Sequence, residues 1–283
     1  MKRNQEKLPD IPVMILCGGK GTRLRDVTEV LPKPMVPIGD QPILWHIMKS
    51  YAAFGFKRFI LCLGYKREVF IDYFCNYHMR NADSTIRLGR EPEITIHNDL
   101  EDNDWEVTLV QTGLESATGK RVAIASRYLR ESDQNFFLTY GDGLSDVDIK
   151  KQYRHHLESK KLLTVTAVHA PARFGELELK NDTIRNFNEK TASSAGYING
   201  GFMTVNRKYL AAYLKTEKAL NDYFEAESMH LAIEDGEIGV FRHEGFWQCM
   251  DTPREYELLN RLFQSGKAPW TRHWKSRKTD PTK

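Results

Sequence analysis

The sequence predicts an α/β fold in which a mainly parallel mixed sheet is flanked by helices and a smaller antiparallel extension follows. Two observations carry this prediction. Apolar segments of strand length alternate with helix-like segments through the first half of the chain, as in consecutive βαβ units. The strand-like runs are continuously apolar, which is typical of parallel strands that are buried on both faces. With 283 residues, 41% of them hydrophobic, the chain can bury one large core.

The expected elements follow one another in βαβ order. Residues 11–17 (IPVMILC) form a strand, residues 41–54 a helix with proline near its first turn, and residues 57–63 a second strand. A helix over about 66–79, a strand over 135–140 and a helix over about 146–159 continue the series. Such a Rossmann-like sheet should place its ligands at the carboxyl ends of its strands.

The second half of the chain changes character. From residue 162 onward the strands are short, which favours an antiparallel extension. We therefore expect a single domain over 11–270, with one half over about 11–160 and the other over about 161–265. A flexible tail over 1–10 and a basic, frayed tail over 271–283 should flank it. Residues 80–104 are polar and predict an irregular loop, which at that length is usually functional or involved in oligomer contacts.

Charge and cysteine usage exclude several classes of protein. Forty-one Lys plus Arg against 38 Asp plus Glu leave a net charge of +3, too balanced for a main partner that is nucleic acid or an anionic membrane. The four cysteines are far apart, so neither a zinc site nor a disulfide framework is indicated, and a cytoplasmic location fits best. No stretch is as apolar as a membrane span, and residues 1–10 lack the centre of a signal peptide. His155 and His156 are adjacent, which predicts a surface pair and no metal site.

The run CGGKGTRL, which follows the first strand, predicts a phosphate-binding turn. A Walker A loop is excluded because its lysine follows the last glycine, whereas Lys20 precedes Gly21. A dinucleotide fingerprint is weak because its third glycine position holds Leu24. A glycine turn remains, in which backbone N–H groups approach a nucleotide and Arg23 holds phosphate oxygens. The alternative is an ordinary strand-to-helix turn.

Lys33 strengthens the phosphate interpretation. It stands between two prolines in PKPM, so it is expected to be presented from a stiff extended segment. A preorganised ammonium group loses less entropy when it meets a polyphosphate. The alternative is a lysine that merely caps a turn.

The motifs as a set resemble the sugar-1-phosphate nucleotidylyltransferases. LCGGKGTRL followed by PKPMVPIG is similar to the signature of that superfamily, and the likeness runs from about Val13 to Trp270. Within it, QPILWHIMKSYAAFGFKRFILCLGYK, WEVTLVQTG, TYGDGLSDVDI, RFGELEL, INGGF, GFWQCMDT and GKAPW most resemble the glucose-1-phosphate cytidylyltransferases. The resemblance implies a homo-oligomeric enzyme and an extension that binds sugar.

The resemblance also implies a reaction and a metal. An oxygen of a sugar 1-phosphate would attack the α-phosphorus of CTP, forming CDP-glucose and releasing pyrophosphate. Mg²⁺ prefers hard oxygen ligands, and the superfamily pattern places it on Asp142, in TYGDG, and Asp251, in QCMDT. From the residues alone, the alternative is that both aspartates are helix N-caps or turn residues.

The remaining site residues are implied by the same likeness. Arg23, Lys33 and Lys190 are the catalytic cations, with Lys190 at the sugar phosphate. The nucleotide would contact Leu16, Gly18, Gly19, Gly21, Thr22, Thr112, Gly113 and Arg121. The resemblance suggests that Arg121 reaches the nucleotide across a subunit boundary, and the alternative is an arginine on a helix surface. Sugar hydroxyls would meet Glu189 and Asn199, and Gly175 would line their pocket. Turn residues and an exposed charged pair are the alternatives for this second set.

Three positions depart from the cytidylyltransferase pattern. Gln111 stands where aspartate is usual, and a glutamine amide could donate to a uracil or thymine carbonyl, so UTP or dTTP is an alternative substrate. Thr191 replaces proline behind Lys190, which leaves another sugar 1-phosphate open. Cys17 replaces alanine and is expected to be a small buried hydrophobe.

Two rival functions come from other classes. A catalytically silent sensor of nucleotide sugars would be expected to lose the metal aspartates or the cationic loop, and this chain keeps both. A dinucleotide-dependent oxidoreductase rests only on the incomplete glycine fingerprint.

Overall fold

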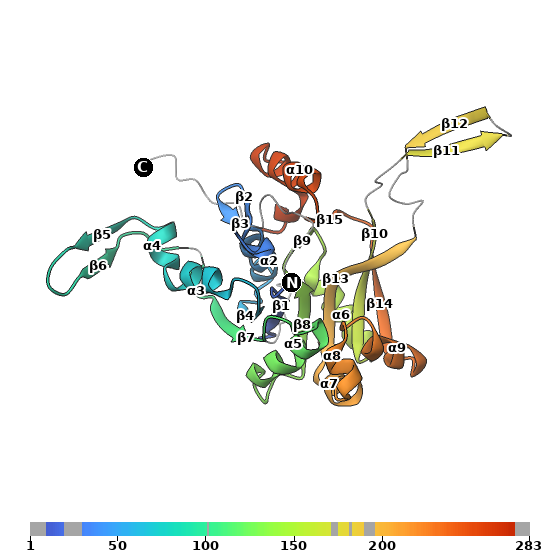
Figure 1. Cartoon of the computed structure of the whole chain (residues 1–283), viewed down its shortest axis with the longest axis horizontal. Helices are drawn as coiled ribbons and strands as arrows, with labels where there is room; N and C mark the ends of the chain where they lie inside the picture. Colours follow the sequence, from blue (N-terminus) through green and yellow to red (C-terminus); the bar gives the residue numbers. More distant parts are fainter. Residues whose placement is uncertain are drawn as a thin grey trace, which may run out of the picture.

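A seven-stranded mixed sheet forms the centre of the molecule (Figure 1). The computed structural model describes residues 10–19, 30–100, 102–170, 175–180, 183–189 and 196–274, with only the backbone described in 175–189. In spatial order the strands are β14 (Ile238–His243), β10 (Leu163–His169), β13 (Tyr197–Asn206), β8 (Asn135–Tyr140), β1 (Val13–Leu16), β4 (Arg58–Leu63) and β7 (Glu106–Gln111).

The sheet is mainly parallel, as predicted. β8, β1, β4 and β7 are parallel neighbours, and β10 is parallel to β14. β13 runs antiparallel to both β8 and β10 and so joins the two groups. The short strands expected in a separate extension, β10 and β13, therefore belong to the main sheet. Both halves of the chain share one hydrogen-bonded ladder.

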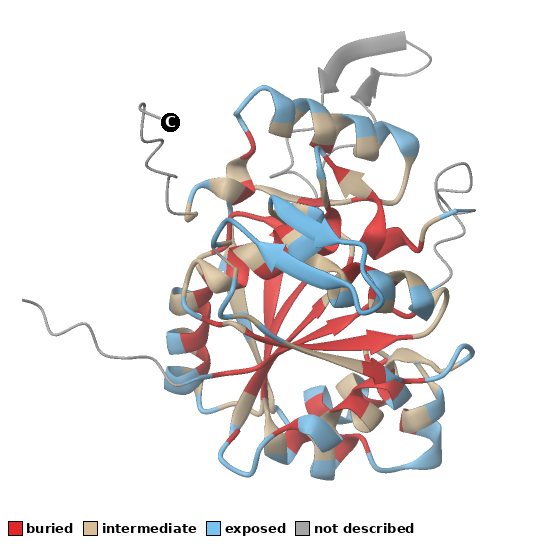
Figure 2. Cartoon of the chain, turned by 90° about the vertical axis from the view of Figure 1, so that its left-hand side faces the viewer, coloured by how far each residue is buried: buried red, intermediate tan, exposed pale blue. Residues whose placement is uncertain are grey.

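Helices cover both faces of the sheet, which explains its continuously apolar strands (Figure 2). On β1, Val13 and Ile15 pack into one core, and Met14 and Leu16 pack into the other. The first core is covered by α2 (Ile43–Ala52), α3 (Arg67–Cys75), α6 (Ile149–Ser159) and α10 (Pro253–Gln264). The second is covered by α5 (Thr118–Ala125), α7 (Arg207–Tyr213), α8 (Glu217–Asn221) and α9 (Glu227–Glu234).

Small two-stranded ribbons and 3-10 turns complete the described structure. The ribbons are β2 (Pro37–Ile38) with β3 (Gln41–Pro42), β5 (Ser84–Arg87) with β6 (Glu93–Ile96), β9 (Gly143–Ser145) with β15 (Trp247–Cys249), and β11 (Gly175–Lys180) with β12 (Thr183–Glu189). The 3-10 turns are η2 (Lys33–Met35), η3 (Ser126–Tyr128) and η5 (Pro269–Thr271). The β11–β12 ribbon is antiparallel and lies apart from the main sheet (Figure 1).

Two expectations about the second quarter of the chain need correction. The helix expected over 66–79 is two helices, α3 and α4 (Tyr77–Asn81), which meet at the non-helical residue Asn76 (φ −102°, ψ 17°). The segment 80–104, expected to be irregular, contains the β5–β6 hairpin. Alternating threonine and isoleucine build its strands, but its overall polarity hid that pattern. All eight strand residues are exposed.

Two further expectations were wrong at the level of single residues. His156 is buried and not at the surface: its ring nitrogens contact Thr164 Oγ1 at 2.8 Å and Asn135 Oδ1 at 3.3 Å. Residues 271–274, expected in a frayed tail, pack on the body, where Arg272 Nη1 donates to Asp146 Oδ2 at 2.6 Å. The rest of that tail lies outside the described residues. Within the described part of the chain, no helix has the length and apolarity of a membrane span.

Candidate active site

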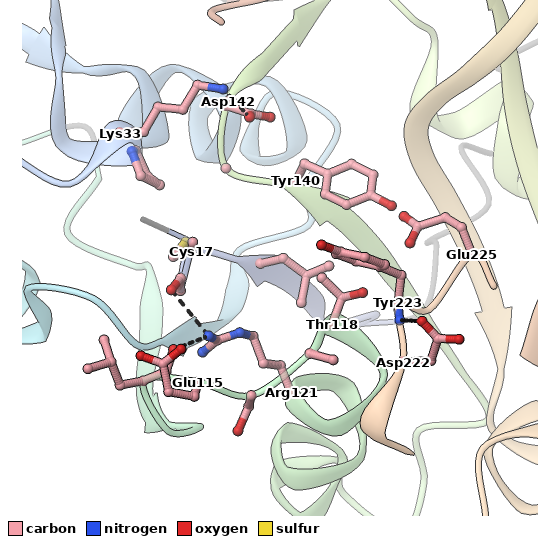
Figure 3. A pocket seen from close by; sticks show the side chains of 18 of the residues that line it. Cys17, Lys33, Glu115, Thr118, Arg121, Tyr140, Asp142, Asp222, Tyr223 and Glu225 are labelled. Carbon is pink, nitrogen blue, oxygen red and sulfur yellow. Dashed lines mark hydrogen bonds and ion pairs between the residues drawn. The ribbon is translucent and has the colours of Figure 1, made fainter. Parts of the chain in front are cut away.

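A cavity of about 820 Å³ opens where β1 and β8 end (Figure 3). These strands are parallel neighbours with Leu16 paired to Tyr140, so the segments that follow them leave the sheet side by side. Gly141 permits this close approach, because a Cβ there would come within 2.9 Å of Pro34 and 3.1 Å of the Leu16 carbonyl. The lining comes from residues 16–19, 33–34, 114–118 with Arg121, 140–142, 221–223 with Glu225, and Asp251.

Lys33 enters one end of the cavity from a rigid turn. Pro32 precedes η2 in an extended conformation (φ −65°, ψ 144°), and Pro34 follows within the turn. The lysine is only 8% exposed. Its Nζ donates to Asp142 Oδ2 at 2.7 Å and to Asp251 Oδ1 at 2.5 Å. The two aspartates predicted to bind metal therefore converge on one ammonium group.

The β9–β15 ribbon brings the two aspartates together from distant parts of the chain. Asp142 lies in the turn between β8 and β9, and Asp251 follows β15. The backbone N–H of Met250 donates to the Asp142 carbonyl at 2.9 Å. Thr252, and not Asp251, caps α10, in a capping box with Glu255. The alternative that Asp251 is the N-cap of a helix is therefore wrong.

The electrostatics keep Lys33 charged. Burial alone would lower the pKa of Lys33, but the charges and hydrogen bonds of Asp142 and Asp251 outweigh burial and raise that pKa. One ammonium group then faces two carboxylates, so this end of the cavity retains negative charge that a further cation can balance.

The donor set fits a magnesium ion. The two carboxylates already point at a common position, that of the Lys33 Nζ. Carboxylate oxygens are hard ligands, and Mg²⁺ is commonly held by one or two carboxylates together with phosphate oxygens and water. Among the described residues no group of three or more His, Cys, Asp or Glu side chains could hold a metal. A metal at Asp142 and Asp251 would therefore depend on substrate oxygens for its other ligands.

Arg121 lines the cavity at a distance from Lys33 (Figure 3). Its side chain is buried (4% exposed), so the alternative of a helix-surface arginine is wrong. Nη1 donates to Thr112 Oγ1 at 2.8 Å and to the Gly113 carbonyl at 2.7 Å. Nη2 donates to the carbonyls of Gly18 at 3.2 Å and Leu114 at 3.0 Å. One guanidinium group thus joins the loop after β1 to the loop after β7.

The space that this guanidinium group occupies requires glycine at two positions that lie against it, Gly18 and Gly64. A Cβ on Gly18 would lie 2.1 Å from Arg121 Nη1, and a Cβ on Gly64 would lie 2.5 Å from the same atom. No Cβ is accommodated at such distances without a shift of the arginine. The glycine predicted to leave room for a nucleotide therefore also leaves room for Arg121 within the protein.

The far wall of the cavity is a loop between α8 and α9. Two backbone contacts fix it to the start of α5: Phe224 N donates to Thr118 Oγ1 at 2.7 Å, and Gly119 N donates to the Asp222 carbonyl at 3.2 Å. A Cβ on Gly119 would lie 3.0 Å from the Asp222 carbonyl in this loop and 2.4 Å from the Ala219 carbonyl in α8. Helix α5 and this loop therefore pack in direct contact.

Sequence reasoning missed three residues that this wall and β8 contribute. Tyr140, Tyr223 and Glu225 line the cavity together (Figure 3). Tyr140 stands directly before the recognised Gly-Asp motif, and its place at a strand end was a usable signal. Tyr223 and Glu225 lie in a loop with no motif, and nothing in the sequence pointed to them.

The structure places some predicted residues in this cavity and others elsewhere. Leu16, Gly18, Gly19, Lys33, Arg121, Asp142 and Asp251 line it. Thr112 and Gly113 contact Arg121 but do not line it, and Asn199 lines a second pocket beside β14. Gly175 and Glu189 are paired across the β11–β12 ribbon. Gly21, Thr22, Arg23 and Lys190 lie outside the described residues.

Two of the departures from the family pattern are also located. Gln111 ends β7 and is exposed, and its Oε1 accepts from Arg67 Nη1 at 2.7 Å. Cys17 is 1% exposed, as expected for a small buried hydrophobe, and burial raises the pKa of its thiol well above the ordinary value. Thr191 lies outside the described residues.

Known proteins resemble this chain over most of its length. The family model described as nucleotidyl transferase matches residues 12–261. Glucose-1-phosphate cytidylyltransferase of Salmonella typhimurium is 42% identical over 259 residues, which cover 91% of this chain and 97% of that protein. A probable glucose-1-phosphate cytidylyltransferase of Bacillus subtilis is 38% identical over 257 residues, covering 91% and 98%. A putative glucose-1-phosphate thymidylyltransferase from Bacillus anthracis, solved with sucrose, has a TM-score of 0.63 at 16% identity, covering 89% of this chain and 94% of that one.

Proposed function

Because the chain belongs to the nucleotidyl transferase family, we propose that it transfers CMP from CTP to α-D-glucose 1-phosphate, giving CDP-glucose and pyrophosphate. Relatives of 42% and 38% identity that carry the name glucose-1-phosphate cytidylyltransferase support both substrates. The observation that carries the proposal is the convergence of Lys33, Asp142 and Asp251 at the end of a cavity large enough for a nucleotide.

Catalysis of this reaction depends on positioning the substrates and stabilising charge, and it does not require a general base. A phosphate monoester has a second pKa of about 6, so the attacking oxygen is already largely ionised near neutral pH and needs no general base. The new bond joins that oxygen to the α-phosphorus of CTP, and the bond to the β-phosphate breaks. Two anions must therefore be held together, a task for fixed cations.

The chain's own groups suit this task. Lys33 carries a charged, buried ammonium group that donates to the two aspartates. This group could exchange these hydrogen bonds for hydrogen bonds to the polyphosphate. Asp142 and Asp251 would hold Mg²⁺, which supplies charge neutralisation to the reacting phosphates. Arg23 at the departing phosphates and Lys190 at the sugar phosphate are assigned from their motifs alone.

The assignment of cytosine as the base and glucose as the sugar is supported by the similarity to the two glucose-1-phosphate cytidylyltransferases. Gln111 Oε1 accepts a hydrogen bond from Arg67 Nη1, and Gln111 does not line the cavity. UTP or dTTP, and another sugar 1-phosphate, therefore remain the alternative substrates for the same chemistry.

We also propose that the enzyme is a homo-oligomer. The β5–β6 hairpin projects from the body (Figure 1) and exposes Ile86, Leu88 and Ile94. An isolated hairpin is marginally stable in water, so burial of its apolar side chains against a second copy would stabilise it.

A cytoplasmic setting suits the four free cysteines.

The decisive experiment is a matrix of CTP, UTP, dTTP and GTP against several hexose 1-phosphates, with Mg²⁺, read as pyrophosphate release. We expect the highest kcat/KM for CTP with glucose 1-phosphate. A higher value for another pair would keep the reaction type and replace the substrates. No release from any pair would contradict the proposal and favour a silent nucleotide-sugar sensor.

A charge-removing variant tests the role of the aspartates. Asp142→Asn should lower turnover by at least about 100-fold, the usual effect of losing one electrostatic contact to a transition state. Asp148→Asn is the matched control, because Asp148 caps α6 outside the cavity. Equal turnover in both variants would show that Asp142 has no part in the reaction.

A further inference from the structure

Tyr140 presents a hydroxyl group that nothing in the described structure satisfies. Its Oη is buried and has no hydrogen-bond partner among the described residues. The few other buried side-chain atoms without a partner belong to residues that do not line the cavity. A buried hydroxyl without a partner is unfavourable, and a ligand that supplies the partner recovers the lost interaction.

The position of this hydroxyl is fixed by packing. A Cβ on Gly201 of β13 would come within 2.4 Å of the Tyr140 ring, so the ring lies directly against that strand. Gly201 itself has a positive φ of 76°, a conformation that suits glycine. A ligand group that meets the Tyr140 hydroxyl would therefore meet a preorganised partner.

Glu225 faces the same space from the opposite wall. The side chains of Tyr140 and Glu225 point toward each other across the cavity (Figure 3). Within the described structure, this carboxyl group accepts a hydrogen bond from its own backbone N–H and from no other residue. Burial raises the pKa of the carboxyl group, which marks a polar group that lacks compensating partners.

The chemistry of this pair selects its ligand. A carboxylate repels phosphate, so Glu225 is unsuited to the polyphosphate that the rest of the cavity serves. A single carboxylate beside a phenol is also a poor metal site. Hydroxyl groups fit both partners, because they donate to a carboxylate and exchange a hydrogen bond with a phenol. Both proposed substrates carry such groups, on ribose and on the hexose.

We propose that Tyr140 and Glu225 form a subsite that recognises hydroxyl groups of a substrate sugar ring and contributes to specificity. This assignment rests on the proposed function. Tyr223, which is 67% exposed, lines the cavity together with Tyr140 (Figure 3). In the proposed complex, a rotation of this exposed side chain would give the sugar ring access to the buried Tyr140 hydroxyl, and the Tyr223 ring would then lie against one face of the sugar.

Substrate analogues that lack single hydroxyl groups test the subsite directly. The probes are 2′-deoxy-CTP and 3′-deoxy-CTP for the ribose, and the monodeoxy glucose 1-phosphates for the hexose. The wild-type enzyme should prefer the natural substrate over at least one analogue by about tenfold or more in kcat/KM. The analogue that is disfavoured identifies the ring in the subsite.

Two conservative variants then remove the protein's side of the contact. Tyr140→Phe keeps the ring against Gly201, and Glu225→Gln keeps the side-chain volume. Each should lower kcat/KM for the natural substrate by about 5- to 10-fold, as expected for one lost hydrogen bond, with no change for the disfavoured analogue. The ratio of kcat/KM for the natural substrate to kcat/KM for the disfavoured analogue should therefore fall toward 1 in the variants.

The matched control removes a tyrosine hydroxyl outside the cavity. Tyr213 Oη donates to Asp235 Oδ2 at 2.8 Å and lines no part of the site, so Tyr213→Phe should keep wild-type discrimination. Wild-type discrimination in Tyr140→Phe and Glu225→Gln against every analogue would overturn the subsite. If the wild type itself releases no pyrophosphate, the proposed function fails instead. Calorimetric titration with CTP and with glucose 1-phosphate then tests the subsite, and an unchanged Kd in both variants overturns it.

Discussion

Lys33 holds together two carboxylates that would otherwise repel each other. Its Nζ lies 2.7 Å from Asp142 and 2.5 Å from Asp251, at the position where a metal shared by the two aspartates would be expected. In the structure the lysine acts as their counter-ion, and under the proposed function it would pair with the polyphosphate once a metal occupies the two aspartates. The same side chain therefore preserves the geometry of the site before any ligand arrives.

Replacing this lysine should change metal binding in the absence of nucleotide. In Lys33→Met the two carboxylates lose their internal cation, so Mn²⁺, as a magnetic substitute for Mg²⁺, should bind about tenfold more tightly, a difference of about 1.4 kcal/mol. Electron paramagnetic resonance of free Mn²⁺ measures this affinity without any turnover.

Lys49→Met is the control for loss of a buried ion pair away from the cavity, since Lys49 Nζ lies 2.7 Å from Asp102. It should leave Mn²⁺ affinity as in the wild type. Unchanged or weaker Mn²⁺ binding in Lys33→Met would contradict the counter-ion role.

The residues that could be predicted from the sequence are those that belong to motifs. Asp142 and Asp251 were expected together because each stands in a recognised pattern, and the structure brings them together. The pairing of Lys33 with both was not expected, because a lysine's partners depend on which ligands are present. Tyr140 and Glu225 meet only through the packing of a loop against α5, which no local pattern encodes.

At the scale of elements, the loop after β1 and helix α5 are built around one buried guanidinium group. Arg121 on α5 donates to carbonyls in the loops after β1 and β7, so the shape of the part of the cavity that Arg121 lines depends on this contact. Desolvation by burial lowers the pKa of the Arg121 guanidinium, although that group stays charged at physiological pH.

Adjacent glycines provide a matched test of this contact. Gly18→Ala places a Cβ 2.1 Å from Arg121, whereas a Cβ on Gly19 meets no atom of the described residues within 4 Å. We expect Gly18→Ala to lower the free energy of unfolding by about 1–3 kcal/mol, as overpacking does. Gly19→Ala should change it by less than about 0.5 kcal/mol. Urea denaturation measures both, and equal stabilities would show that Arg121 adjusts without cost.

Elements with strong apolar patterns were predicted well, and those that depend on polar or distant partners were not. β1, β4 and β8 were identified because strands buried on both faces are continuously apolar. The β5–β6 hairpin was missed because its strands lie outside the core. The break at Asn76 was missed because no glycine or proline marks it.

At the scale of the whole molecule, two buried histidines make stability depend on pH. Burial lowers the pKa of His46 and of His156 to about 4, from an ordinary value of 6.5. The unfolded chain therefore binds protons near pH 6.5, and the folded protein binds them only near pH 4. Their contribution to stability is complete above pH 6.5 and is lost as the pH falls toward 4.

The slope of this loss can be measured. Each histidine should contribute up to about 1.4 kcal/mol per pH unit to the free energy of unfolding between pH 4 and 6.5. His156→Gln should remove about half of the combined slope in urea titrations at a series of pH values. His78 is exposed, so His78→Gln should leave the slope as in the wild type. A wild-type slope in His156→Gln would contradict the assignment.

The fold class as a whole followed from the order of strands and helices, but the division of the chain did not. The short strands after residue 162 were expected to form an extension, yet β13 pairs with β8 and so enters the central sheet. The paired residues of β8 and β13 are 65 to 71 positions apart in the sequence. Pairing over that separation depends on how the whole core packs, and local sequence patterns do not contain this information.

Because β13 joins β8 and β10 in one ladder, the two groups of parallel strands are hydrogen-bonded to each other through the middle of the sheet. β1 and β8, which end at the cavity, belong to the same ladder, so their pairing fixes the spacing between the segments that follow them. Variants selected for bulkier acceptors should therefore carry their changes in the rim loops, and the strands beneath should keep their register.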